Sequence, residues 1–275
     1  MTDSDCISFL QAALPRLGLR WPGFRKVRRL VCKRLARKLR ELNLPDLAAY
    51  RAVLETRPGE WAILDGYCRI PISRFYRDRE VFEHLEHGVL PGLAGAAIAE
   101  GRSELQCWSA CCASGEEPYT LAILWRLRLQ HLFPGLVLRI IATDIDARVL
   151  QRARTGCYRA SSLKALPPPL LAEAFTRHGQ ELCVRDEFRA VEFFQEDIRQ
   201  TMPEGEFDLI LCRNAVLTYF EPALQHAVMG PVAARLRAGG ALVVGIHESI
   251  PENLPGLVPW PGARAIYRKL APAAA

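Results

Sequence analysis

Acidic, basic and amide side chains follow three apolar, strand-like runs of the sequence, either directly or after a short loop. In chain order they are Glu116 with Glu117, Asp144, and Arg213 with Asn214. In a doubly wound α/β sheet, ligands bind beyond the carboxyl ends of the strands, which is where such residues would lie. Two adjacent carboxylates suit a ligand that carries positive charge, and they repel a phosphate group. The pattern therefore favours a site for a cationic ligand.

The loop before Glu116 consists almost entirely of small residues, which would let a ligand approach the backbone closely. It contains a single glycine, Gly115, and no G-x-G-x-x-G pattern. A pyrophosphate cradle is therefore not indicated. The macrodipole of a helix favours acidic residues in the first turn, so Glu116 and Glu117 also have a purely structural interpretation.

Two further positions could contact a ligand at the same edge of the sheet. Asp144 follows the second strand roughly 30 residues after the first loop, where nucleotide-binding sheets carry the acid that holds ribose hydroxyls. Helix capping is the alternative role, and Asp146 is the better placed of the two for it. Tyr219 and Phe220 come soon after Asn214 and could form an aromatic rim over a flat ligand.

The elements that must position these residues alternate along the chain. Apolar runs predict strands and amphipathic segments predict helices, with strands at 105–109, 136–143, 191–194, 207–212 and 241–246 and helices at 118–132, 147–155 and 223–236. Strands separated by helices of about 10–15 residues indicate βαβ units. We therefore predict an α/β fold with a mainly parallel, doubly wound sheet.

The first 60 residues have a different composition, with thirteen Lys and Arg against six Asp and Glu. Apolar residues at three- and four-residue steps predict one amphipathic helix over residues 24–42. Another face of this helix carries five cations, which we call the basic stripe: Lys26, Arg29, Lys33, Arg37 and Arg40. The basic stripe is either a solvated helix face or a surface for an acidic partner, and phosphates would suit it as well as carboxylates.

The nine cysteines are odd in number, and several stand inside apolar runs. In a chain of 275 residues this pattern predicts reduced, buried thiols in a cytoplasmic protein. No cysteine or histidine spacing indicates a metal site. No apolar run approaches the length of about 18 residues that a membrane span needs. The first residues lack the basic region and apolar core of a secretory signal.

Six short motifs occur in order along the chain: Phe75-Tyr76-Arg77-Asp78, Trp108-Ser109-Ala110 with Ser114-Gly115-Glu116-Glu117-Pro118-Tyr119, Thr143-Asp144-Ile145-Asp146, Gly156-Cys157-Tyr158, Cys212-Arg213-Asn214 and Tyr219-Phe220. Over roughly residues 8–270 they resemble the CheR-type chemotaxis receptor methyltransferases. The resemblance implies a helical N-terminal domain, 1–70, and a Rossmann-like S-adenosylmethionine domain, 71–275, with a small antiparallel insertion at about 182–190. It also implies methyl transfer to glutamate side chains of chemoreceptors, giving methyl esters.

The resemblance carries specific roles to residues of this chain. It places cofactor contacts at Ser73, Arg77, Glu117, Asp144, Asp197, Ile198, Arg213 and Asn214. We expect Arg77 and Tyr219 to position groups at the transferred methyl. The basic stripe corresponds to the segment that docks on an acidic receptor helix. We expect a monomer, with no metal and no nucleic-acid partner.

The sequence departs from the family pattern at several positions. Pro71 stands where the family usually has Asn, Thr218 takes an aliphatic position, and Ile246-His247 displaces a histidine by one residue. These changes concern the substrate more than the cofactor. They leave open a methyltransferase of the same fold that acts on a small molecule or on another protein. A non-catalytic regulator that binds S-adenosylmethionine is a further alternative.

Overall fold

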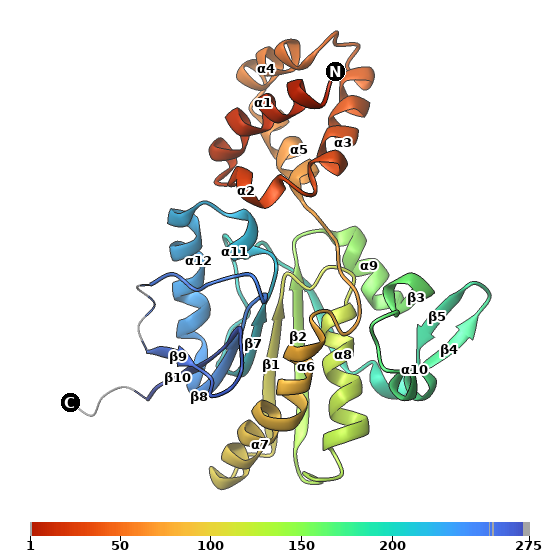
Figure 1. The fold of residues 1–275 in the computed structure, drawn as a ribbon, viewed down its shortest axis with the longest axis vertical. Coiled ribbons are helices and arrows are strands. Elements are labelled where there is room, and N and C mark those ends of the chain that lie inside the picture. The colour runs from red at the N-terminus through yellow and green to blue at the C-terminus, as the bar shows by residue number, and fades with distance from the viewer. Residues whose placement is uncertain (1, 253, 255, 272–275) are drawn as a thin grey trace. The chain divides into compact units, whose positions relative to one another are not determined.

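The computed structural model describes residues 2–252, 254 and 256–271, and the chain divides into two compact units (Figure 1). The first unit comprises Met1–Ile70 with Thr218–Gln225, and the second comprises Pro71–Leu217 with His226–Ala275. The resemblance places a domain boundary after residue 70, and this boundary stays a prediction. Residues 218–225 were not expected in the first unit. The predicted domain limits also include residues 1 and 272–275, which lie outside the described residues.

The first unit is helical. Its elements are α1 (Asp3–Ala13), a 3₁₀ turn (Leu14–Leu17), α2 (Trp21–Phe24), α3 (Arg28–Glu41), α4 (Leu47–Thr56) and α5 (Gly59–Cys68). The Thr2 and Asp5 side chains form a capping box at the start of α1, which satisfies backbone N–H groups that the helix leaves unpaired. Buried Phe9, Leu35 and Tyr50 form the centre of the core. The helices thus pack around a core of their own.

The helix predicted over residues 24–42 is shorter in the structure, because α3 begins at Arg28. Phe24 ends α2 and is fully buried, and the chain turns between it and α3, with the Val27 N–H donating to the Phe24 carbonyl at 3.0 Å. Lys26 therefore precedes α3, whereas the other four residues of the basic stripe lie on it. All five side chains of the stripe are exposed.

The segment 218–225 joins the first unit through backbone contacts. The Arg20 N–H donates to the Tyr219 carbonyl at 2.8 Å, and the Glu221 N–H donates to the Gly18 carbonyl at 2.8 Å. Gly23 lies against the Thr218 carbonyl so closely that a Cβ at position 23 would collide with it. The chain therefore returns to the N-terminal unit long after leaving it, which periodicity along the sequence does not reveal.

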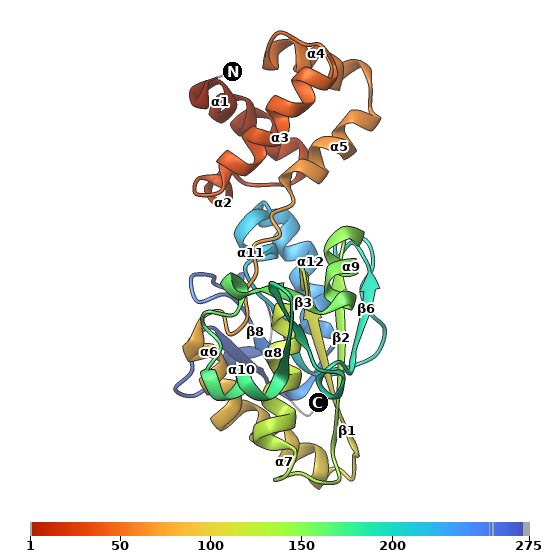
Figure 2. The same cartoon turned by 90° about the vertical axis from the view of Figure 1, so that its right-hand side faces the viewer.

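The second unit is built on a seven-stranded sheet in the order β6-β2-β1-β7-β8-β10-β9. Its strands are β6 (Val191–Gln195), β2 (Val137–Asp144), β1 (Glu104–Ala110), β7 (Phe207–Cys212), β8 (Leu236–Val243), β10 (Ile266–Lys269) and β9 (Leu257–Pro259). The first five are parallel to one another, whereas β10 runs antiparallel to both of its neighbours, β8 and β9. β1 and β2 lie side by side with β6 at the edge (Figure 2). The predicted doubly wound α/β fold is confirmed.

Helices connect and cover these strands. They are α6 (Arg79–His84), α7 (Leu90–Ala99), α8 (Glu116–Leu124), α9 (Ala147–Thr155), α10 (Pro168–Ala174), α11 (Val216–Tyr219) and α12 (Pro222–Ala234), with short π-helical turns at Leu85–Val89 and Trp125–Leu129. All six residues of β7 are buried. A strand that is buried on both faces reads as a continuous apolar run, which is why 207–212 was recognisable from the sequence.

A second, three-stranded antiparallel sheet has the order β3-β5-β4, with β3 (Cys157–Arg159), β5 (Glu181–Val184) and β4 (Phe175–His178). The insertion expected at 182–190 is therefore misplaced, because only β5 reaches into that range and 186–188 form a 3₁₀ turn. The residue that marks the start of the small sheet is Gly156. It ends α9 with φ 68°, and β3 begins at the next residue. Glycine adopts this left-handed conformation without a steric penalty.

The expectation that all the cysteines are reduced is wrong for four of them. Cys6 is bonded to Cys32, and Cys157 is bonded to Cys183. The second pair faces across the β3–β5 ladder, where the two residues are directly opposite each other. The first pair joins α1 to α3. Neither pairing has a local signature, since each disulfide links residues 26 positions apart.

Candidate functional site

The carboxyl ends of three neighbouring parallel strands lie at one level of the large sheet. Ala110, the last residue of β1, is in register with Thr143 of β2 and with Cys212 of β7. Asp144 and Arg213 directly follow those two partners. The strand register therefore brings the predicted site residues to one edge, as the switch-point rule requires.

The loop from Cys111 to Gly115 has an unusual backbone. Cys111, Ala113 and Gly115 all have positive φ, at 57°, 50° and 86°. A left-handed conformation is disfavoured for residues with a Cβ, so surrounding contacts must hold it. The Cys112 N–H donates to the Thr143 carbonyl at 2.9 Å, which ties this loop to the end of β2.

Asp144 organises the same loop. Its Oδ2 accepts the Ala113 N–H at 2.9 Å, and its Oδ1 accepts the Asp146 N–H at 2.9 Å. Asp146 itself caps α9 by accepting the Arg148 N–H. The alternative of Asp144 as the helix cap is therefore answered, because Asp146 has that role. Each carboxylate oxygen has more than one lone pair, so Asp144 retains capacity to accept ligand hydroxyls.

Arg213 is the buried centre of an ion-pair network, with only 2% of its side chain exposed. Its Nη1 lies 3.0 Å from Glu117 Oε2, and its Nη2 lies 2.8 Å from Asp78 Oδ2. The same Nη2 donates to the Arg77 carbonyl at 2.9 Å. Ser109 completes the network by donating its hydroxyl to Glu117 Oε1 at 2.8 Å. Arg213 thus joins the end of β7 to the start of α8 and to the segment before α6.

The residues around Arg77 are held in a constrained conformation. Tyr76 and Asp78 have φ of 55° and 60°, on either side of Arg77. Phe75 is fully buried, and the Tyr76 N–H donates to the Thr120 hydroxyl at 3.2 Å. Arg77 is half-buried and donates to the Ile72 carbonyl at 3.0 Å. This packing fixes the backbone from which the Arg77 guanidinium projects.

Glu116 is a buried carboxylate at the start of α8, 2% exposed. Its Oε2 has no hydrogen-bond partner among the described residues. Burial raises the pKa of Glu116 above its usual range. A backbone hydrogen bond, the charge of Arg152 and a hydrogen bond with Ser73 each lower this pKa and offset part of the shift. The last contact places Ser73 beside the first turn of α8. A buried oxygen without a partner is one that a bound ligand could satisfy.

Asp197 and Ile198 follow β6 at the edge of the sheet. The Asp197 carboxylate pairs with Arg199 at 2.9 Å, and Ile198 is 7% exposed. Burial raises the pKa of the Cys111 thiol well above its usual range, and the nearby Asp144 and Asp197 carboxylates contribute to the shift. Asp197 therefore lies close to the loop that Asp144 organises.

Tyr219 belongs to the first unit. Its ring packs against Phe24 with a centroid distance of 5.0 Å. The side chain is only partly buried, so packing does not account for all of it. The role expected for Tyr219 at the transferred methyl stays a prediction, as do the cofactor contacts assigned to the residues of the second unit.

The sequence analysis assigned no role to two residues that contact the predicted site residues, Asp78 and Glu248. Asp78 stands in a recognised motif, but its ion pair with Arg213 spans 135 positions. Glu248 accepts backbone N–H groups from Asn214 and Gly245 through one oxygen. The available signal for Glu248 was a carboxylate shortly after the last predicted strand, as for Asp144.

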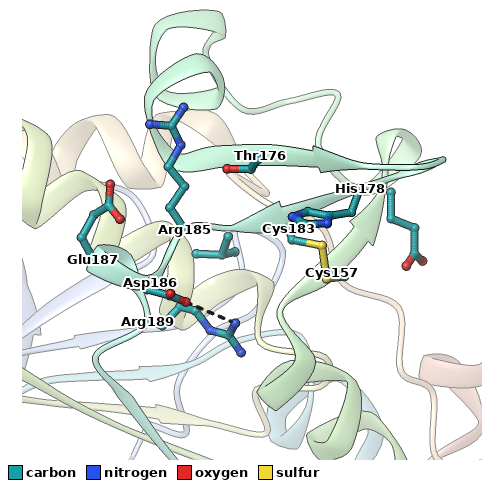
Figure 3. A pocket seen from close by; sticks show the side chains of 10 residues that line it. Cys157, Thr176, His178, Cys183, Arg185, Asp186, Glu187 and Arg189 are labelled. Atoms are coloured by element: carbon teal, nitrogen blue, oxygen red, sulfur yellow. Dashed lines mark ion pairs between the residues drawn. A yellow bond between two sulfur atoms is a disulfide. The ribbon is translucent and has the colours of Figure 1, made fainter.

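A separate cavity of about 700 Å³ lies on the three-stranded sheet (Figure 3). Cys157, Thr176, His178 and Cys183 line one part of it, and Arg189 lies at another part, paired with Asp186 at 3.7 Å. The predicted cofactor residues do not line this cavity.

The second unit is thus a Rossmann-like α/β domain whose ligand edge carries several carboxylates and a buried arginine. A family model described as CheR methyltransferase, SAM binding domain, matches residues 72–259. The chain therefore belongs to the CheR family.

No helix in the described part of the chain has the length and apolar character needed to span a bilayer.

Two chemotaxis protein methyltransferases and one uncharacterized protein are similar to this chain. A chemotaxis protein methyltransferase of Listeria innocua is 36% identical over 66% of this chain and 66% of its own length. Chemotaxis protein methyltransferase 2 of Pseudomonas aeruginosa is 34% identical over 80% of this chain and 78% of its own length. An uncharacterized 104.1 kDa protein of Rhodobacter capsulatus is 30% identical over 89% of this chain. This chain spans 26% of the Rhodobacter protein and 66% of the Listeria protein.

The residues at the sheet edge fit S-adenosylmethionine, the ligand of this family domain. That molecule carries a sulfonium, an ammonium and two ribose hydroxyls. The edge offers Glu117, Asp144 and Asp197 as acceptors, and Glu116 adds a buried oxygen with no partner among the described residues. The small-residue loop with left-handed positions lets a flat molecule approach the backbone. The charge of the edge therefore favours a cationic nucleoside.

Proposed function

We propose that this protein transfers a methyl group from S-adenosylmethionine to glutamate side chains of a chemoreceptor, forming methyl esters. The observation that carries the proposal is the match of the family model to residues 72–259, supported by relatives named as chemotaxis protein methyltransferases. The carboxylate-rich edge with its buried Arg213 supplies the site. The activity does not require a metal ion.

The chemistry assigns a limited task to the protein. When bound, S-adenosylmethionine supplies an activated methyl group, and a glutamate with a pKa of about 4.3 is already ionised at neutral pH. No general base is needed. The site must instead hold the carboxylate in line with the methyl, and positioning of this kind can lower a barrier by about 7–11 kcal/mol in favourable cases.

In this proposal each residue has one role. Asp144 accepts the ribose hydroxyls, and Glu117 faces the charged end of the cofactor while Arg213 fixes its orientation. Ser73, Asp197, Ile198 and Asn214 complete the contacts. Arg77 and Tyr219 position groups at the methyl. The Tyr219 ring shields the sulfonium, and its hydroxyl orients the acceptor carboxylate. The sulfonium attracts an aromatic face by about 0.5–2 kcal/mol, depending on desolvation.

The acceptor side of the proposal rests on the basic stripe. Lys26, Arg29, Lys33, Arg37 and Arg40 are exposed, and an acidic helical surface of a receptor is the partner they suit. We also propose that the protein acts as a monomer in the cytoplasm. The two disulfides are unusual for that compartment. Thiol titration of protein isolated from the cytoplasm under acid quench tests whether the two disulfides form in that compartment.

The deciding experiment measures transfer of labelled methyl from S-adenosylmethionine to membranes that contain a chemoreceptor. Label that is released as methanol in mild base identifies a methyl ester. The matched control is a receptor in which the modified glutamates are replaced by alanine, and it should take up no label. Base-stable label, or transfer to a small molecule alone, would favour the alternative methyltransferase. Cofactor binding without any transfer would favour a non-catalytic regulator.

A further inference from the structure

Glu248 follows β8 and places one carboxylate oxygen between the ends of two strands. Its Oε2 accepts the Asn214 N–H at 2.8 Å and the Gly245 N–H at 2.7 Å. The Glu248 N–H in turn donates to the Gly245 carbonyl at 2.8 Å. β7 and β8 are parallel neighbours, so the carboxylate joins the chain just after β7 to the chain just after β8.

This contact reaches Asn214, whose backbone is in the left-handed conformation. Asn214 has φ 54°, in the left-handed region, which is uncommon for a residue with a Cβ. Asn adopts this region more readily than most residues with a Cβ, so the hydrogen bond to Glu248 selects one of the conformations that are open to it. A hydrogen bond from an N–H to a carboxylate is shorter and stronger than a neutral one. Glu248 therefore supplies a charge-assisted contact at this residue.

Gly245 is shaped to admit this arrangement. A Cβ at position 245 would lie 2.8 Å from Glu248 Oε2 and 2.9 Å from Asn214 Oδ1. Real Cβ atoms essentially never approach other atoms this closely. The Asn214 amide, the Glu248 carboxylate and the Gly245 backbone therefore converge at one point. Any side chain at 245 would push the first two groups away.

Glu248 is not a core residue. It is partly exposed and borders a cavity of about 340 Å³ that His247, Ser249 and Arg264 also line. A carboxylate at the boundary with solvent has no need of two backbone N–H groups for its own burial. The contact serves the backbone that donates to it.

We propose that Glu248 is a positioning residue for the cofactor site, acting through Asn214. By fixing the turn after β7 it sets the direction of the Asn214 side chain and the position from which Arg213 reaches Glu117. This inference rests on the proposed function, because it assigns Asn214 to the cofactor. It adds a residue that controls cofactor affinity through the backbone of Asn214.

The first test compares Glu248→Ala with Glu248→Gln in the full chain. Calorimetry with S-adenosylhomocysteine measures affinity, and thermal unfolding measures stability. We expect Glu248→Ala to weaken binding by about tenfold or more, because two N–H groups lose a charged acceptor. Glu248→Gln keeps an oxygen that accepts both, so its affinity should stay within about threefold of the wild type. Glu252→Ala, at an exposed acid in the same segment, is the matched control.

A purely structural role predicts a different result. In that case Glu248→Ala lowers the unfolding temperature while affinity stays within about twofold of the wild type, and the inference is overturned. If Glu248→Ala does not fold, Glu248→Asp carries the test, since its shorter side chain withdraws the same carboxylate from both N–H groups. Glu248→Asp should weaken binding with little change in the unfolding temperature. Unchanged affinity in Glu248→Asp also overturns the inference.

A double-mutant cycle tests the route through Asn214. If Glu248 acts through this residue, adding Glu248→Ala to Asn214→Ala should weaken binding by much less than it does in the wild type. Additive losses would mean that Glu248 acts by another route. Wild-type protein that binds no S-adenosylhomocysteine would remove the proposed function itself. If the wild type binds S-adenosylhomocysteine and Glu248→Ala binds it with the same affinity, only this inference is overturned.

Discussion

Arg213 and Glu117 are separated by 96 positions in the sequence and by 3.0 Å in the structure, between Nη1 and Oε2. The guanidinium also reaches Asp78, so one buried cation orients two carboxylates from different segments. An arginine suits this task because its planar group can donate in two directions at once. The pair therefore fixes the start of α8 against the end of β7.

Loss of Arg213 should destabilise the second unit. Arg213→Ala leaves Glu117 and Asp78 without their cation in a site where each side chain is only 14% exposed. Breaking a buried pair from one side typically costs about 3–5 kcal/mol of the free energy of unfolding. Arg213→Lys should recover only part of the lost free energy of unfolding, because an ammonium lacks the planar guanidinium that donates to two carboxylates at once. Denaturant unfolding measures both. Arg79→Ala, at an exposed ion pair, should leave the midpoint unchanged.

Glu116 predicts a specific pH dependence of stability. Burial raises its pKa above the usual 4.5, so the folded state holds its proton at pH values where the unfolded state has lost it. The contribution of Glu116 to the free energy of unfolding is therefore fully present below about pH 4.5, and it is lost as the pH rises through the raised pKa. Glu116→Gln should be more stable than the wild type at pH 7.

The Glu116→Gln advantage should vanish towards pH 4, where the wild-type carboxyl is protonated as well. Denaturant midpoints of the two proteins across this range measure the difference. Glu187→Gln, at an exposed carboxylate, is the control. The difference between its denaturant midpoint and that of the wild type should not change with pH in this way. A constant gap for Glu116→Gln would show that Glu116 is not titrating in the folded protein as its burial implies.

Replacement of Asp144 should weaken cofactor binding. Asp144→Ala removes the acceptor for the ribose hydroxyls and also releases the Ala113 N–H, which the carboxylate holds at 2.9 Å. We expect a loss of affinity of at least about tenfold by calorimetry. Asp186→Ala, at a side chain that is 99% exposed, is the control. Unaltered affinity in Asp144→Ala would remove this residue from the site.

Charge reversal on the basic stripe should affect the protein acceptor alone. Lys33→Glu combined with Arg37→Glu should raise KM for an intact receptor and leave cofactor affinity unchanged, because exposed charges mainly steer association. The double variant Arg57→Glu and Arg126→Glu changes the net charge equally at exposed positions elsewhere. Equal KM values for the two double variants would mean that the stripe is a solvated face.

Tyr219→Phe separates the ring of Tyr219 from its hydroxyl. The ring packs on Phe24 and the substitution keeps that contact, so the fold should be preserved. If the hydroxyl orients the acceptor carboxylate, kcat should fall about tenfold or more with cofactor affinity nearly unchanged. Full turnover on a receptor would limit Tyr219 to packing in the first unit.

Much of this protein can be predicted from local patterns. Strand and helix periodicity predicted the parallel sheet, and the polar residues after each apolar run predicted which edge carries the site. The prediction of the sheet is confirmed because side-chain periodicity reports the buried face directly, and parallel strands then bring the predicted site residues to one edge. Family motifs then predicted the cofactor. Asp144 and Arg213 could be named before any coordinate was known.

Only the tertiary structure decided how these residues are joined. Asp78 reaches Arg213 across 135 positions and Glu248 reaches Asn214 across 34, and such contacts leave no periodic trace. The return of 218–225 to the first unit, the start of the small sheet at Cys157 and the disulfide from Cys157 to Cys183 depend in the same way on chain segments that meet in space. Local sequence fixes the conformational preference of each element, whereas contacts between distant elements depend on how the whole chain closes.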